Sequence, residues 1–203
     1  GIGSGSHGYQ IGEVIKRVEE VLIKDKPDLV VVPGDTNSAV GAAIASAKLR
    51  IITAHLEASL RIYNPFMQEE MNRRIIDHIS HVLFAPTNYA YKNLLQEGIE
   101  ENRIFLTGDT MLDTFLRFRD KIQQINVYEK YNLEPRKYLV MTLHRDFNTD
   151  YPERLKEIIG ALTNFCERYN KIKILFLVHP RTRTRLLEYG YIRVLERSKN
   201  IIL

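Results

Sequence analysis

The stretch IITAHLEASLRIYNPFMQEEMNRR, residues 51–74, decides the fold class. It opens with a short apolar run, Ile51 to Ala54, continues into a charged loop, and ends in an amphipathic helix that starts near Gln68. In open α/β proteins the carboxyl ends of parallel strands face the ligand crevice, so charged side chains follow the strands there. We therefore expect a parallel sheet, with a site at the point where this strand ends.

The same alternation of strand and helix continues along the chain. The run at 29–32 is predicted to be a strand buried on both faces. The helix from Gln68 is predicted to bury Met71, Ile75 and Ile79, which recur at four-residue spacing. Further apolar runs typical of strands occur at 82–85, 103–107, 138–143 and 172–178, and helical patterns separate them. The predicted fold class is α/β with parallel sheets.

Two domains are predicted from the loss of apolar period over residues 125–136 and the helix before it. Residues 1–115 would belong to a first domain and residues 116–203 to a second. Residues 1–10 are expected to be a glycine-rich loop before a helix from Ile11, and Asp150 is expected to cap a later helix. The chain opens on a loop that should follow a strand and closes inside a strand signal, so we expect a piece of a longer protein.

The composition excludes several classes of function. The net charge of +4 comes from 29 basic and 25 acidic residues that are interspersed, so no nucleic-acid partner is expected. No apolar run approaches the about 18 residues of a membrane-spanning helix, so no membrane partner is expected either. The single cysteine, Cys166, excludes an internal disulfide, is expected to be buried, and fits a reducing, cytoplasmic compartment.

Polar side chains recur where the predicted strands stop. This repetition at one topological position predicts a ligand crevice. Arginine and histidine suit an anionic ligand such as a diphosphate, and carboxylates suit general acid–base catalysis. The residues concerned are Asp35, His55, Glu57, Thr87, Asp109, His144, Arg145 and His179.

Simpler interpretations exist for several of these residues. Asp35 follows Pro-Gly, where a turn or cap residue is common. Glu69 and Glu70 in a first helical turn favour the helix dipole without any catalytic role. His55 is expected to orient backbone rather than to react, and the cluster at Arg181, Arg183 and Arg185 is equally typical of a solvated helix start.

An ordered set of motifs resembles the non-hydrolysing UDP-N-acetylglucosamine 2-epimerases. The motifs are PGDTNS at 33–38, HLEASLR at 55–61, QEEMNR at 68–73, FAPT at 84–87, GDTMLD at 108–113, HRDFN at 144–148 and VHP at 178–180. The resemblance covers essentially the whole chain. It implies a B-type glycosyltransferase-like fold, two Rossmann-like domains with nucleotide bound between them, and a homodimer.

The resemblance also implies a reaction and its residues. UDP-N-acetylglucosamine and UDP-N-acetylmannosamine would interconvert by anti-elimination of UDP through 2-acetamidoglucal and re-addition, with no metal or other cofactor. The implied catalytic residues are Asp35, Glu57, Glu69 and His144, and the implied substrate-binding residues are Arg61, Arg145, Asn148 and His179. Which carboxylate is acid and which is base stays open. In some bacterial members UDP-N-acetylglucosamine is also an allosteric activator, and Glu69, Arg145 and His179 could belong to that second site instead.

The chain departs from the family pattern in ways that bear on activity. Ser59 replaces the usual glycine of HxEAGLR, where it could strain a turn that glycine makes freely. Gln68 replaces the usual proline. The GTRPE loop and the SGG-x-QEE segment, which contact the nucleotide in the family, are not in the sequence. We therefore expect the chain alone to be inactive. The alternatives are an epimerase of another UDP-2-acetamido sugar, or a non-catalytic fragment or scaffold of the same fold.

Overall fold

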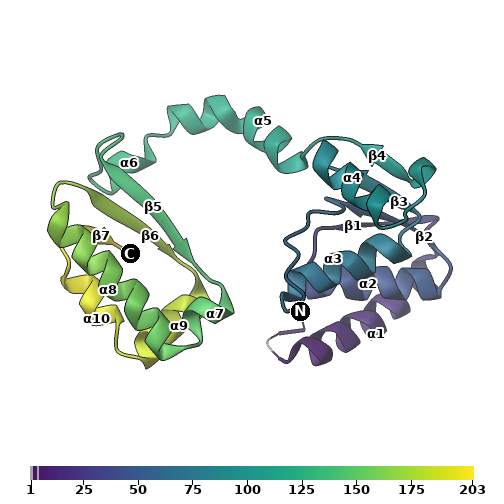
Figure 1. Cartoon of the computed structure of the whole chain (residues 1–203), viewed down its shortest axis with the longest axis horizontal. Helices are drawn as coiled ribbons and strands as arrows, with labels where there is room; N and C mark the ends of the chain where they lie inside the picture. Colours follow the sequence, from purple (N-terminus) through teal and green to yellow (C-terminus); the bar gives the residue numbers. More distant parts are fainter. Residues whose placement is uncertain (1, 4) are drawn as a thin grey trace. The chain divides into compact units, whose positions relative to one another are not determined.

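The computed structural model describes residues 2–3 and 5–203 and divides into two compact units (Figure 1), Gly1–Phe118 and Arg119–Leu203. The division falls within helix α5, Thr110–Gln124, as does the boundary that the sequence predicts. Strands and helices alternate in both units and every paired strand is parallel. The predicted α/β class with parallel sheets is confirmed.

The first unit contains a four-stranded sheet in the order β1-β2-β3-β4. Its strands are β1 Leu29–Pro33, β2 Ile52–Leu56, β3 Val82–Ala85 and β4 Ile104–Leu106. Its helices are α1 His7–Asp25, α2 Asn37–Lys48, α3 Gln68–Ile79 and α4 Asn88–Gln96, with a 3₁₀ turn at Glu101–Arg103 before β4. Figure 1 shows α1, α2 and α3 side by side.

Helices cover one face of this sheet. Val32, His55, Leu83 and Ile104 pair across the four strands and are all buried on that face. The prediction that the run at 29–32 is buried on both faces is wrong: Leu29 and Val31 are each 47% exposed. They alternate with Val30 and Val32, so they point away from the described helices, which pack against the other face.

Helix α3 is turned differently from its predicted orientation. Met71 and Ile75 are 44% and 38% exposed, so the predicted apolar face is not the buried one. The buried residues of α3 are Glu70, Asn72, Arg73, Ile76 and Asp77. This helix therefore presents a polar face to the sheet, and polar partners must meet it there because buried polar groups need hydrogen bonds.

The beginning of the chain also differs from its prediction. Helix α1 begins at His7, four residues before Ile11, because the Ser6 side chain accepts a hydrogen bond from the Tyr9 amide at 3.3 Å and caps the helix. Gly1 and Ser4, which belong to the predicted loop, lie outside the described residues. None of the helices in the described part of the chain is long and apolar enough to cross a membrane.

The second unit contains a three-stranded sheet in the order β5-β6-β7. The elements are α6 Val127–Lys130, β5 Tyr138–Leu143, α7 Asp146–Thr149, α8 Pro152–Arg168, β6 Lys173–Val178, α9 Pro180–Glu188, α10 Ile192–Arg197 and β7 Ile201–Ile202. Its core joins the two sheet residues Ile174 and Phe176 to Leu155 and Ile159 of α8 and Leu186 of α9. Cys166 belongs to this core, as predicted.

Asp150 does not cap α8, although the sequence predicted that it would. The N-cap is Tyr151, without a side-chain hydrogen bond, and Pro152 occupies the first turn, where its missing amide hydrogen is not needed. The Asp150 carboxylate instead binds Arg181 and Arg185 of α9. The aspartate thus joins two helices rather than ending one.

Candidate active site

Asp35 lies in the turn that follows β1, at the carboxyl edge of the first sheet. Gly34 has φ +68°, a conformation that glycine adopts without strain. Thr36 caps α2, since its side chain accepts a hydrogen bond from the Ala39 amide at 3.2 Å. The turn is therefore a short strand-to-helix connection that exposes the Asp35 carboxylate at the sheet edge.

Glu57 lies beside this turn. It follows the adjacent strand β2, and a Cβ placed on Gly34 would lie 3.9 Å from Glu57 Oε2. Glu57 has φ +64°, which is unfavourable for any residue with a side chain. The backbone is held there because the Ala58 amide donates to the Phe84 carbonyl at 3.1 Å. Strain of this kind recurs at functional sites, where the surrounding structure maintains it.

The first turns of α3 fix the Asp35 turn from a third side. Asn72 Nδ2 donates to the Asp35 carbonyl at 2.9 Å and to Asn37 Oδ1 at 3.2 Å. Arg73 Nε lies 3.5 Å from Asp35 Oδ2 and donates to the Glu69 carbonyl at 3.3 Å. Arg73 therefore links the Asp35 carboxylate to the backbone of Glu69, and Asp35, Glu57 and the start of α3 form one site within the first unit.

Glu70, the neighbour of Glu69, has a structural role. Its carboxylate accepts hydrogen bonds from the Ile62 amide at 2.9 Å and from Arg74 Nε at 3.0 Å. Burial alone would raise the pKa of Glu70, but these two hydrogen bonds outweigh it and lower the pKa. Glu70 thus fastens the charged loop to α3, and it forms an i,i+4 ion pair with Arg74 on that helix.

A network of four ionisable side chains, three of them fully buried, lies beneath the site. Asp77 Oδ1 is 2.6 Å from His55 Nδ1, and Asp77 Oδ2 accepts hydrogen bonds from Arg61 Nη2 at 2.6 Å and the Ser59 amide at 3.2 Å. Arg61 also binds Glu97 in two places, with Nε–Oε1 2.8 Å and Nη2–Oε2 2.7 Å. Bidentate pairs of this kind are strong and directional.

The geometry argues against the substrate contact implied for Arg61. Its side chain is fully buried, and two of its three nitrogens are engaged by Glu97 and Asp77. Burial alone would lower the pKa of Arg61, but Glu97 and Asp77 outweigh it and raise the pKa. The hydrogen bond from Arg61 in turn lowers the pKa of Glu97. Arg61 therefore supports the loop that carries Glu57.

The second unit brings His144 and His179 together. They follow the adjacent strands β5 and β6, which pair Leu143 with Val178 at their carboxyl ends, and their ring centres are 5.8 Å apart. His179 Nδ1 accepts a hydrogen bond from the Arg181 amide at 3.2 Å, so a neutral His179 carries its proton on Nε2. Both rings line a hollow of about 600 Å³, together with Tyr131, Thr142, Leu175, Phe176, Leu177, Val178, Arg183 and Leu203.

Arg145 and Asn148, the other two predicted residues of this unit, do not line the hollow. Arg145 is the N-cap of α7, and the Asn148 amide donates to the Arg145 carbonyl at 3.0 Å. Arg183 does line it and was missed as an individual residue by the sequence prediction. Its signal was the spacing: four positions separate His179, at the N-cap of α9, from Arg183, so both lie on one side of the helix start.

Two interactions orient α9 and hence His179 and Arg183. The Thr182 hydroxyl donates to the Leu143 carbonyl at the end of β5. Asp150 binds Arg181 and Arg185, with 3.0 Å between Oδ1 and Arg185 Nε. The hydrogen bond from Arg181 lowers the pKa of Asp150 further than burial raises it, and Arg185 adds to the lowering. These contacts thus fix the direction of the helix start.

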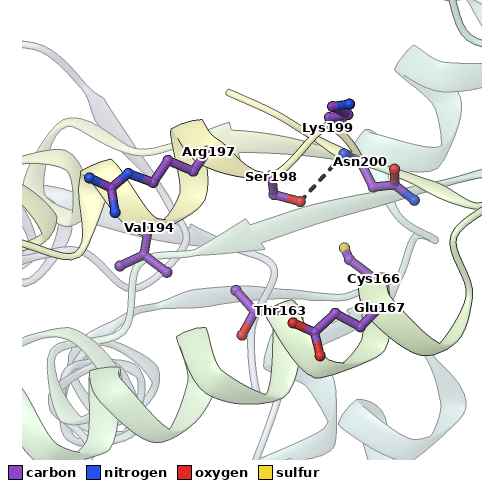
Figure 2. Close-up of a pocket in the computed structure, with 8 residues that line it drawn as sticks. All are labelled: Thr163, Cys166, Glu167, Val194, Arg197, Ser198, Lys199 and Asn200. Carbon is purple, nitrogen blue, oxygen red and sulfur yellow. Dashed lines mark hydrogen bonds between the residues drawn. The ribbon is translucent and has the colours of Figure 1, made fainter.

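A second hollow of the same unit, of about 490 Å³, lies apart from these residues (Figure 2). Thr163, Cys166 and Glu167 of α8 face Val194 and Arg197 of α10 and the segment Ser198 to Asn200 that leads into β7. It therefore lies at the amino end of β7, whereas His144 and His179 follow the carboxyl ends of their strands. Burial raises the pKa of the Cys166 thiol despite a hydrogen bond with Ser198, which makes this cysteine a weak nucleophile.

Across residues 2–3 and 5–203, no group of three or more His, Cys, Asp or Glu side chains is placed to hold a metal ion.

The fold and both sites define a class of protein. Parallel α/β units with polar side chains after the carboxyl ends of their strands are typical of Rossmann-like proteins. The sequence pattern of one family, UDP-N-acetylglucosamine 2-epimerase, matches residues 1–203, so the chain belongs to that family.

Individual relatives agree with this assignment. A UDP-N-acetylglucosamine 2-epimerase of Methanocaldococcus jannaschii is 44% identical over 203 residues, which cover 98% of this chain and 55% of the relative. The crystal structure of the M. jannaschii UDP-GlcNAc 2-epimerase in complex with UDP-GlcNAc and UDP matches with a TM-score of 0.91 over 98% of this chain and 55% of that one. A UDP-2,3-diacetamido-2,3-dideoxy-D-glucuronate 2-epimerase of Pseudomonas aeruginosa is 39% identical over 185 residues, 90% of this chain and 50% of the relative. The chain thus spans about half the length of these relatives.

Proposed function

We propose that the protein containing this chain interconverts UDP-N-acetylglucosamine and UDP-N-acetylmannosamine. In the forward direction a base removes the C2 proton while UDP leaves C1 with the bonding electrons, giving 2-acetamidoglucal. Re-addition returns UDP to C1 and places a proton on the opposite face of C2. The observation that carries the proposal is the carboxylate site of the first unit, where Asp35, Glu57 and the start of α3 meet at one sheet edge.

The chemistry of the two sites suits the two halves of this reaction. The C2 proton is weakly acidic, so its removal needs positioned carboxylates, which we assign to Asp35, Glu57 and Glu69. The departing diphosphate is anionic, and cationic or hydrogen-bonding groups stabilise it. We assign that role to His144, which follows β5, and to His179 and Arg183 at the start of α9. Arg145, the N-cap of α7, and Asn148 of α7 are further binding residues.

We propose further that the 203-residue chain alone does not turn over. The support is that this chain spans 55% of its M. jannaschii relative, so residues that the relatives possess have no counterpart in it. A homodimer, a cytoplasmic location, activation by UDP-N-acetylglucosamine and a place in polysaccharide biosynthesis are predictions that rest on the family resemblance.

A second candidate function is the epimerisation of another UDP-2-acetamido sugar. The P. aeruginosa relative, named for a diacetamido glucuronate, supports it at 39% identity. The residues assigned above act on the parts that the two substrates share, C2 and the diphosphate, so the assignment suits both sugars.

Two measurements test the proposal. The complete gene product is incubated with UDP-N-acetylglucosamine and, separately, with the diacetamido glucuronate, and the C2 epimers are followed by proton NMR. We expect the mannosamine epimer from the first substrate; turnover of the second alone would favour the alternative. Calorimetry with UDP separates an enzyme from a scaffold, since a complete protein that binds no UDP and turns over neither sugar would contradict both functions. Turnover by the 203-residue chain would contradict its proposed inactivity.

A further inference from the structure

We propose that His55 is an imidazolium whose Nε2–H holds the turn that carries Asp35, so that His55 and Asp77 are positioning residues for the acid–base site. The catalytic consequence rests on the proposed function of Asp35. The charge and the hydrogen bonds of His55 do not rest on it, and they can be measured without any activity.

The hydrogen bonds of the His55 ring determine its protonation. Nε2 lies 2.9 Å from the Gly34 carbonyl oxygen, which can only accept, so Nε2 carries a proton. Nδ1 lies 2.6 Å from Asp77 Oδ1. An ionised carboxylate can also only accept, so Nδ1 carries a second proton and the ring is cationic. A neutral ring would place a nitrogen lone pair against a carboxylate oxygen at this short distance.

The surroundings keep Asp77 ionised. Its other oxygen accepts from the Arg61 guanidinium at 2.6 Å and from the Ser59 amide at 3.2 Å, and both interactions favour the carboxylate. Arg61 is in turn paired with Glu97. The four groups therefore comprise two cations and two anions, which is the balance that a buried cluster needs.

The two neighbours of His55 in the sheet are apolar. On either side in the sheet lie Val32 and Leu83, both buried, and the His55 side chain has no exposed surface. Water cannot replace a lost hydrogen bond at either ring nitrogen without opening this core. A proton on His55 is thus held by Asp77 and protected from solvent.

The consequence for the site is a backbone clamp. His55 fixes the Gly34 carbonyl from β2, and Asn72 fixes the next carbonyl, that of Asp35, at 2.9 Å from α3. Two successive peptide groups of the turn are therefore tied to two different elements. Displacement of a catalytic group by about 1 Å can lower the rate by about 100-fold, so a clamp at this place affects the reaction without touching the substrate.

The protonation is tested by NMR on the 203-residue chain labelled with ¹⁵N-histidine. The chain contains six histidines, and the His55 signals are assigned by their loss in His55→Gln. We expect both His55 ring nitrogens to show directly bonded protons from pH 6 to 8. One unprotonated ring nitrogen at pH 7 would overturn the inference. In Asp77→Asn the side-chain amide can donate to Nδ1, so we expect Nδ1 to lose its proton while Nε2 keeps its own.

The clamp is tested by hydrogen exchange of the Gly34 amide, which donates to the Leu56 carbonyl at 3.1 Å. In His55→Gln we expect exchange about five- to tenfold faster, the effect of losing one hydrogen bond. His78→Gln is the matched control, because His78 is exposed on α3 and bonds the Arg74 carbonyl of its own helix. Unchanged exchange at Gly34 in a folded His55→Gln chain would overturn the positioning role.

In the complete gene product, His55→Gln should lower kcat about 10- to 100-fold with little change in KM, since the substrate is not contacted. An unchanged kcat with the NMR results as expected would overturn the catalytic consequence alone. An inactive wild-type protein would contradict the proposed function and leave the protonation and exchange results standing.

Discussion

Removal of the Asp77 side chain should come close to unfolding the first unit. Asp77→Ala deletes the acceptor for three donors, His55 Nδ1 at 2.6 Å, Arg61 Nη2 at 2.6 Å and the Ser59 amide at 3.2 Å. It also leaves the buried Arg61 guanidinium with Glu97 as its remaining ion-pair partner among the described residues. Breaking a buried ion pair by removing one partner costs about 3–5 kcal/mol. We expect a loss near 4 kcal/mol, within this range, because both Asp77 and Arg61 are fully buried.

Urea unfolding, followed by circular dichroism and by NMR signals of the first unit, measures this loss. With a slope of about 2 kcal/mol per molar urea, a loss of about 4 kcal/mol lowers the midpoint by about 2 M. Arg74→Ala is the matched control on the same helix: Arg74 is 47% exposed and pairs with Glu70, so its loss should cost about 0.5 kcal/mol. A midpoint for Asp77→Ala within 0.3 M of the control, an allowance of about 0.6 kcal/mol at that slope, would refute the claim that this network holds the unit together.

Other predictions concern single residues. Ser59→Gly should stabilise the first unit by about 1 kcal/mol. Ser59 has φ +61° and a buried hydroxyl with no hydrogen-bond partner among the described residues, and glycine removes both costs. A lower urea midpoint for the variant would contradict this prediction. Arg61 lowers the pKa of Glu97, so the stability from this pair is complete above the ordinary pKa of 4.5 and is lost as the pH falls below it. In Glu97→Gln we therefore expect the free energy of unfolding to depend less on pH in that range. An unchanged pH dependence would contradict the pairing. Asp150→Asn should destabilise the second unit by about 1 kcal/mol and weaken UDP binding by the complete protein, whereas unchanged binding would separate Asp150 from the orientation of α9. Cys166 should react with thiol reagents only as the second unit unfolds, since burial raises its pKa; rapid labelling of the folded chain would contradict its burial.

Local signals in the sequence predicted much of the fold. Thr36 caps α2, and Gly98, with φ +83°, follows the end of α4; threonine and glycine are common residue types at these two positions. Asp35 and Glu57 could be assigned to one sheet edge because each lies three positions after the end of an apolar run. Such features depend on neighbours a few residues away, and these neighbours are visible in the sequence.

The polar interior could not be predicted in the same way. The apolar period Met71, Ile75 indicated the wrong face of α3, because the buried face is held by partners that the helix itself does not contain. Asp77 meets His55, 22 residues earlier, and Arg61 meets Glu97, 36 residues later. Burial of a charged residue depends on whether such a distant partner arrives, and periodicity contains no information about it.

The most direct test of the proposed chemistry is the transfer of solvent hydrogen to C2. The complete gene product is incubated with UDP-N-acetylglucosamine in D₂O, and deuterium at C2 is measured in both epimers by NMR, for the wild type and for Asp35→Asn and Glu57→Gln. We predict deuterium at C2 of the mannosamine epimer in the wild type, and a fall of at least about 100-fold in either variant with UDP binding retained. Epimerisation without deuterium at C2, or unchanged rates in both variants, would contradict the assignment of proton transfer to these carboxylates.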